Sequence, residues 1–115
     1  MVEGSLAHER AVDGALVVSL TGEVDAYSAP AVRAQLSELL RSRPDVLVID
    51  LSSVAFLDST ALGVLIGAVK RTREHDGAVR FVRPPADVAR IFELTALDRV
   101  LDFYETRDDA LAVAL

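Results

Sequence analysis

The residues in this sequence best suited to chemistry are a serine hydroxyl and an adjacent carboxylate. Ser59 follows Asp58 and precedes Thr60. A serine can act as a nucleophile when a base lies within hydrogen-bond reach, accept a phosphoryl group from a partner enzyme, or cap a helix. The residues around it place this tripeptide where a buried strand passes into a helix. Functional groups of open α/β sheets gather at such strand ends, so both a cap and a functional site remain open here.

Catalysis by Ser59 itself is the weaker interpretation, because the chain has only two histidines. His8 falls in the first predicted strand, and His75 lies at the far end of the helix after Ser59, roughly 20–25 Å away at about 1.5 Å per residue. Asp58 is no base for Ser59, since adjacent side chains diverge. Motifs of the Gly-x-Gly-x-x-Gly or Gly-Lys-Thr type do not occur, and two histidines without cysteine are too few for a metal site. We therefore expect no enzyme activity, no catalytic residue, no cofactor and no metal.

The elements that position Ser59 begin with two β-favouring runs, at residues 5–12 and 15–21. Asp13-Gly14 between them predicts a two-residue hairpin turn with positive φ at both positions, so these strands should be antiparallel. A loop over residues 22–27 follows. Ser28 is typical of a helix N-cap, and Pro30 fits the first turn of the helix.

The middle of the chain alternates between helical and strand patterns. One helical face carries Val32, Leu36, Leu39 and Leu40. Pro44 ends this helix, and the unbroken apolar run at 46–49 is typical of a strand covered on both faces. We expect a turn around Ser52-Ser53, then a helix from about Ser59 to Asp76, with Gly77 in the C′ position.

Three further elements complete the pattern: a strand over 79–82, a helix opened by Pro84-Pro85 with Val88, Ile91 and Phe92 on one face, and a helix from Thr106, where Thr106 and Asp109 form a capping box. The order predicts an α/β fold: a single domain over 1–115, with a four- to five-stranded mixed β-sheet, an antiparallel N-terminal hairpin and about four α-helices.

The helix after Ser59 is apolar nearly all round, which is typical of a helix deep in a core or covered by a partner. The apolar residues are Ala61, Leu62, Val64, Leu65, Ile66, Ala68 and Val69. Gly63 and Gly67, four residues apart, form a ridge almost without side chains, although each costs about 1 kcal/mol relative to Ala. Close packing on the sheet and close approach by a partner both explain this ridge.

Composition narrows the class of partner. The net charge of −6, from 18 acidic and 12 basic residues, speaks against nucleic acid, because phosphate binding relies on clustered Lys and Arg. No apolar run approaches the roughly 20 residues of a spanning helix, and the charged residues of 1–10 are unlike a secretory signal. Zero Cys fits a reducing compartment. We expect a cytoplasmic protein that contacts neither nucleic acid nor membrane directly.

Three segments together resemble the STAS domain: residues 20–25 (Leu-Thr-Gly-Glu-Val-Asp), 48–51 (Val-Ile-Asp-Leu) and 56–65 (Phe-Leu-Asp-Ser-Thr-Ala-Leu-Gly-Val-Leu). Within that family they are most similar to the anti-sigma-factor antagonists of bacterial partner-switching systems. The likeness runs from about Val17 to Leu115. Thr-Gly-Glu-Val-Asp followed about thirty residues later by Asp-Ser-Thr is specific as a pair, whereas either half alone is weak.

The resemblance implies that an ATP-dependent anti-sigma serine kinase phosphorylates Ser59. The unphosphorylated form would bind that kinase and release a sigma factor, for example in a stress response, and a phosphatase would reset the switch. The implied partner-binding residues are Gly22, Glu23, Asp25, Asp58, Thr60, Gly63, Val64 and Gly67. The family commonly has Gly at the position of Ala61; Ala suits a helix, but it could alter how closely a kinase loop approaches Ser59.

Other roles stay open at this point. A STAS accessory subunit of a transporter or lipid-handling ATPase complex would have no phosphorylation cycle, and a small hydrolase would use Ser59 as its nucleophile. The glycine-ridged helix could also serve a homodimer.

Overall fold

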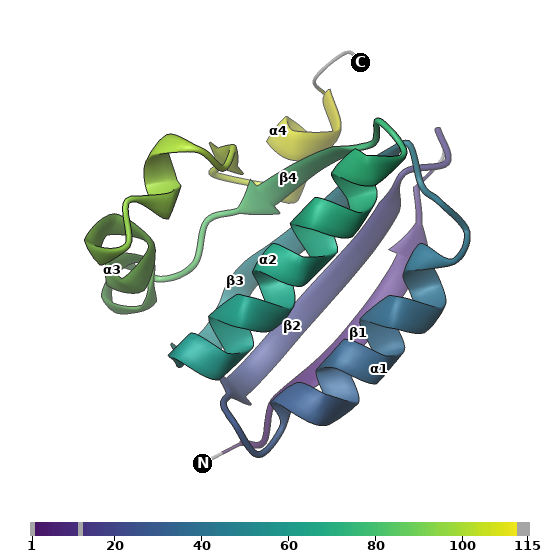
Figure 1. Cartoon of the computed structure of the whole chain (residues 1–115). Helices are drawn as coiled ribbons and strands as arrows, with labels where there is room; N and C mark the ends of the chain where they lie inside the picture. The colour runs from purple at the N-terminus through teal and green to yellow at the C-terminus, as the bar shows by residue number, and fades with distance from the viewer. Residues whose placement is uncertain (1, 12, 113–115) are drawn as a thin grey trace.

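Five strands form one mixed sheet in the order β1-β2-β3-β4-β5 in the computed structural model, which describes residues 2–11 and 13–112 (Figure 1). The strands are β1 (Ser5–Arg10), β2 (Leu16–Val24), β3 (Val46–Leu57), β4 (Ala78–Val82) and β5 (Phe103–Tyr104). β1 pairs antiparallel with β2, and every other pair is parallel. The predicted mixed sheet and antiparallel hairpin are confirmed.

Four α-helices and one 3₁₀ turn connect or follow the strands: α1 (Ala29–Leu40), α2 (Ser59–Glu74), α3 (Ala86–Leu94), η1 (Leu97–Arg99) and α4 (Arg107–Ala112). α1 and α2 lie side by side on one face of the sheet, with their N-terminal ends at the same lower end of the molecule in Figure 1. α3 and η1 lie beyond the β4 side. No helix in the described ranges has the length and apolar character needed to cross a bilayer.

Alternation along β2 divides the core between the two faces of the sheet. Leu16, Val18 and Leu20 pack in the larger cluster with α1, α2 and α3, whereas Val17 packs in a smaller cluster with Ala110 of α4. Each of these five residues is at most 1% exposed. Because both faces of β2 are covered at this end, the strand carries consecutive apolar residues.

β2 and β3 are both longer than the sequence predicted. β2 continues through Gly22 to Val24, where a loop was expected, and a register shift between Gly22 and Glu23 accommodates the positive φ of 77° at Gly22. The predicted turn at Ser52-Ser53 is wrong, because β3 passes through both serines and Ser53 pairs with Thr21. The Ser52 amide and hydroxyl both donate to the Asp50 carboxylate, so polar side chains are satisfied without a turn.

The β1–β2 connection also differs from the predicted two-residue turn. The strands stop at Arg10 and resume at Leu16, and only Gly14 of the Asp13-Gly14 pair has a positive φ, at 87°. The Ala15 amide donates to the Asp13 carboxylate at 3.1 Å, which closes the turn. Val12, the predicted last residue of the first strand, lies outside the described residues.

At the end of α2, Asp76 takes the role predicted for Gly77. The helix ends at Glu74, Asp76 adopts the left-handed φ of 64°, and the Gly77 amide donates to the Thr72 carbonyl. Gly77 is needed for a different reason, since a Cβ there would lie 2.7 Å from the Pro44 carbonyl oxygen. The last helix starts one residue after Thr106, whose hydroxyl accepts the Asp109 amide, which is one of the two bonds of the predicted capping box.

Candidate functional site

Asp58 links the two segments that form the candidate site. One carboxylate oxygen accepts the Ala61 amide at 2.9 Å, so Asp58 is the N-cap of α2, a role that the sequence left open for this tripeptide. The other oxygen accepts the Ala26 amide at 2.9 Å, in the loop between β2 and α1. The Asp58 amide also donates to the Val24 carbonyl. Both carboxylate oxygens therefore fix backbone, and Asp58 holds the β2–α1 loop against the start of α2.

The β2–α1 loop is fixed a second time by Asp25 and Ser28. The Asp25 carboxylate accepts the amides of Tyr27 and Ser28, each at 3.0 Å. Ser28 precedes α1 as predicted, but its hydroxyl does not cap that helix. Instead the hydroxyl donates to the Glu23 carbonyl and accepts the Asp25 amide, both at 3.1 Å. The Ser28 side chain therefore bonds the loop instead of the helix, because the buried loop amide and carbonyl need hydrogen-bond partners.

Ser59 and Thr60 are the first two residues of α2, and both are exposed. At this position the backbone N–H groups of the first turn and the helix dipole favour negative charge. A phosphoryl group on the Ser59 oxygen would therefore meet a favourable field from its own helix. The geometry suits a modification site open to a partner enzyme.

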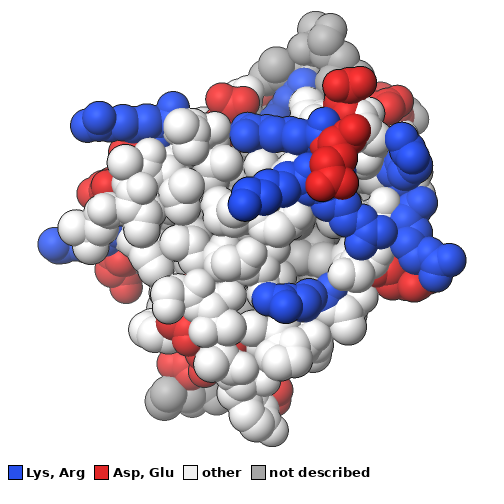
Figure 2. All heavy atoms as spheres, in the orientation of Figure 1, with Lys and Arg blue, Asp and Glu red and all other residues white. Residues whose placement is uncertain are grey.

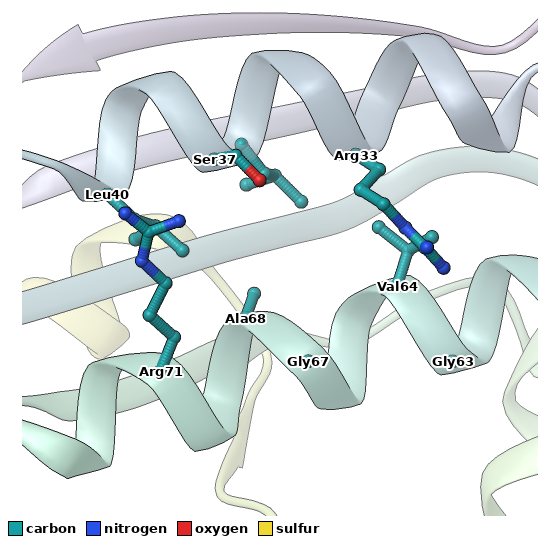
Figure 3. A pocket seen from close by; sticks show the side chains of 9 residues that line it. Arg33, Ser37, Leu40, Gly63, Val64, Gly67, Ala68 and Arg71 are labelled. Carbon is teal, nitrogen blue, oxygen red and sulfur yellow. The ribbon is translucent and has the colours of Figure 1, made fainter.

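A groove lies between α1 and α2, next to Thr60 (Figure 3). Its volume is about 210 Å³. The lining residues are Arg33, Leu36, Ser37, Leu40, Gly63, Val64, Gly67, Ala68 and Arg71. Figure 3 shows Arg33 extending from α1 towards α2 near Val64, and Arg71 extending from α2 towards α1 near Leu40.

Gly63 and Gly67 face outward from α2. A Cβ built on either residue meets no heavy atom within 4 Å, and both residues are exposed. Close packing on the sheet, one of the two explanations left open, therefore does not account for this glycine ridge. The buried apolar residues of α2 lie on the other sides of the helix and belong to the core, and Ile66 is partly buried.

The residues predicted to bind a partner are not all on the surface. Thr60, Gly63 and Gly67 are exposed, and Glu23, Asp25 and Asp58 are half-buried. Gly22 is buried in β2, where a Cβ would lie 2.7 Å from the Val2 carbonyl oxygen, so this glycine shapes the backbone. Val64 is 5% exposed and contributes to the groove only as part of its floor.

Four residues of the loop, strand and helices around the site were not singled out from the sequence. Tyr27 and Phe56 are exposed aromatics, at 81% and 48%, on the loop and on the strand that lead to the site. Arg33 and Arg71 reach into the groove from opposite helices. Aromatic residues near Asp58-Ser59-Thr60 could have been noticed in the sequence, but the position of the arginines depends on how the helices pack.

A second polar cluster joins α4 to the sheet. The Arg107 guanidinium donates twice to one Asp50 carboxylate oxygen, at 2.9 and 3.2 Å, donates to the Ser19 hydroxyl at 2.7 Å, and pairs with Glu9. Burial acts to raise the pKa of Asp50, but the Ser52 hydrogen bonds and the Arg107 guanidinium outweigh it and hold that pKa below its ordinary value of 3.8. This cluster stabilises the fold on the side opposite α1 and α2.

Neither histidine is placed to act on Ser59. His8 is exposed in β1, and the His75 ring nitrogen lies 2.8 Å from the Pro44 carbonyl oxygen beyond the last turn of α2. Over residues 2–11 and 13–112, no three His, Cys, Asp or Glu side chains gather in a way that could hold a metal ion.

Comparison with known proteins assigns the family. The profile of the STAS domain family matches residues 8–110. The chain is a STAS domain. This STAS domain is 35% identical over 85 residues to the anti-sigma-B factor antagonist of Bacillus subtilis, covering 74% of this chain and 77% of that protein. It is 34% identical to the anti-sigma F factor antagonist of Paenibacillus polymyxa, covering 85% of each chain.

Solved structures agree with the fold. The STAS domain matches the crystal structure of an anti-sigma factor antagonist from Mycobacterium paratuberculosis with a TM-score of 0.85 and 34% identity, covering 95% of this chain and 92% of that one. The resemblance noted in the sequence is thereby confirmed for the family and for the fold. These relatives carry the name of anti-sigma factor antagonists.

Proposed function

We propose that this STAS domain is an anti-sigma-factor antagonist that binds an anti-sigma serine kinase while Ser59 is unphosphorylated, and so releases a sigma factor. Phosphorylation of Ser59 by that kinase would end the binding, and a phosphatase would restore it. The observation that carries the proposal is the exposed Ser59 hydroxyl at the start of α2, beside a loop held in place by Asp58. The names of its relatives supply the class of partner.

The phosphorylation step follows general phosphoryl-transfer chemistry. The Ser59 oxygen would attack the γ-phosphorus of ATP, the bond from that phosphorus to the bridging oxygen would break, and ADP would leave. A residue of the kinase would take the Ser59 proton, because Asp58 has both carboxylate oxygens occupied by backbone amides. The STAS domain supplies the accepting hydroxyl and a fixed surface around it, and the step would take place in the cytoplasm.

The switch would act through the binding surface. A phosphate brings about −1.5 to −2 charges and strong acceptor oxygens. Because the N-terminus of α2 favours negative charge, the STAS domain itself should stay folded. A partner surface fitted to a neutral hydroxyl would instead meet a charge next to Asp58, at a cost of several kcal/mol.

The experiment combines the purified STAS domain, ATP and the anti-sigma serine kinase encoded in the same genome, with intact-mass detection. We expect one phosphoryl group per chain, lost in Ser59→Ala and retained in Thr60→Ala, the neighbouring exposed hydroxyl. Ser59→Ala should keep its affinity for the kinase, whereas Ser59→Asp should lose it.

Other outcomes would favour other roles. No phosphoryl gain with any candidate kinase would count against the proposal and in favour of an accessory subunit without a phosphorylation cycle. If phosphorylation were slow in the wild type and faster in Ala61→Gly, then Ala61, the residue that departs from the family, would be what limits recognition by the kinase.

A further inference from the structure

The surface formed by α1 and α2 has a charge opposite to that of the whole chain. The chain carries −6, yet residues 29–43 and 59–74 hold six basic and two acidic side chains. The basic residues are Arg33, Arg41, Arg43, Lys70, Arg71 and Arg73, and the acidic ones are Glu38 and Glu74. Figure 2 shows Lys and Arg side chains gathered mainly over the upper middle and the right of this face, with Asp and Glu side chains among them. Basic charge is therefore concentrated beside the groove in an otherwise acidic protein.

Arg33 and Arg71 are the two charges that line the groove itself. Neither makes an ion pair with any other residue that the structure describes. Arg41 pairs with Glu38, and Arg73 donates to the Val100 carbonyl, so these neighbours are partly engaged elsewhere. The two groove arginines are thus available to carboxylates from outside the chain, which guanidinium groups bind in a bidentate manner.

Between the two arginines the groove is apolar and open. Leu36, Leu40, Val64 and Ala68 form its floor, and a Cβ built on Gly63 or Gly67 meets no heavy atom within 4 Å. The volume of about 210 Å³ is that of one large side chain, not of a drug-sized ligand. This shape fits an apolar side chain with acidic residues on either side.

We infer that the α1–α2 groove binds an acidic segment of the partner kinase, which places one apolar side chain over Gly63 and Gly67 and carboxylates on Arg33 and Arg71. This inference rests on the proposed function. A second hollow lined by Arg33 and Thr60 joins the groove to the start of α2, so one partner can cover the groove and Ser59 together. An acidic segment seated there is also repelled by a phosphate on Ser59, which links its release to phosphorylation.

The test measures the dissociation constant of the purified kinase, with ADP present, for the wild-type STAS domain and three variants. The Arg33→Glu/Arg71→Glu double variant should bind at least about tenfold more weakly and lose the salt dependence of the wild type. Arg90→Glu/Arg99→Glu is the matched control, since both arginines are exposed on α3 and η1, away from the groove. It should bind as the wild type does.

Gly67→Leu fills the groove without harming the fold. Its melting temperature should rise, because Leu is the better helix former and nothing obstructs a Cβ at this position. Weaker binding by a more stable protein cannot result from unfolding. If both groove variants bound the kinase as tightly as the wild type does, this inference would be overturned. The proposed function would still stand. A kinase that neither binds nor phosphorylates the wild type would overturn both.

Discussion

The Asp58 carboxylate accepts the Ala26 amide at 2.9 Å across a sequence separation of 32 residues. Its other oxygen caps α2, so one side chain holds together the loop after β2 and the helix that begins with Ser59. Two of the three segments that carry the family likeness, residues 20–25 and 56–65, therefore meet at one surface. The aspartate in front of Ser59 therefore has a structural role that does not involve catalysis.

Replacing Asp58 should destabilise the fold and loosen the loop. Asp58→Ala removes a helix cap and the bond to Ala26, and we expect a loss of about 2 kcal/mol in the free energy of unfolding. Asp58→Asn keeps one acceptor oxygen and should lose about half as much. Urea denaturation of both variants checks this order. Equal stability of Asp58→Ala and wild type would contradict the role assigned to the carboxylate.

A negative charge at residue 59 should not unfold α2. Ser59→Asp places a carboxylate at the positive end of the helix dipole, and we expect stability equal to the wild type or higher by about 0.5 kcal/mol. The gain should shrink as salt is added, because the charge is exposed. Circular dichroism and thermal melts of Ser59→Asp and of the phosphorylated protein measure this. Loss of helix signal in either would show that the switch works by unfolding.

The outward position of Gly67 predicts opposite effects for two glycine substitutions. Gly67→Ala should stabilise the protein by about 0.5–1 kcal/mol, since its Cβ meets no atom within 4 Å. Gly77→Ala should destabilise it, since its Cβ would lie 2.7 Å from both the Pro44 carbonyl oxygen and the Thr72 side chain. Denaturation midpoints of the pair check the assignment. A destabilised Gly67→Ala would mean that the helix packs there against part of the protein.

The Arg107–Asp50 cluster should make the free energy of unfolding fall as the pH is lowered. The pKa of Asp50 lies below 3.8 in the folded protein, so its contribution is present above the ordinary pKa and is lost as the pH falls through the folded value. Arg107→Met leaves Asp50, which is 7% exposed, without its cation and should cost about 2 kcal/mol near pH 7.

Urea midpoints measured from about pH 7 down to about pH 3 test this assignment. Asp50→Asn should be less stable near neutral pH, and its stability should fall less steeply in acid than that of the wild type. Arg83→Met, which removes an exposed ion pair with Glu105, is the control and should change stability by less than about 1 kcal/mol. Parallel acid profiles for Asp50→Asn and wild type would assign the acid sensitivity to other carboxylates.

The order and type of the elements were predictable because burial leaves a pattern in the sequence. The apolar run at 46–49 and the face of Val32, Leu36 and Leu40 correspond to β3 and α1. The length of β3 was not predictable, because Ser52 and Ser53 favour turns locally and only pairing with β2 keeps them extended. Local propensity likewise favoured Gly77 at a position that Asp76 occupies.

The candidate site was predictable only in part, for a similar reason. Asp58 and Ser59 stand together in the sequence, so the cap and the exposed hydroxyl could be inferred from neighbouring residues. Arg33 and Arg71 are 38 positions apart, and the groove between them exists only because α1 packs beside α2. The outward direction of Gly63 and Gly67 also depends on which side of α2 meets the sheet.

Tyr27 should be an anchor for the partner kinase. Its side chain is 81% exposed, while its amide is held by Asp25 and the preceding amide by Asp58, so an exposed aromatic ring stands on a fixed loop that Asp58 ties to the start of α2. Exposed Tyr residues on rigid backbone are typical of binding hot spots, where truncation costs about 2 kcal/mol or more. Tyr27→Ala should therefore weaken kinase binding about thirtyfold. Leu94→Ala is the matched control, because Leu94 is equally exposed, at 81%, on α3. Neither variant should change the melting temperature, and equal kinase affinities for the two would exclude Tyr27 from the interface.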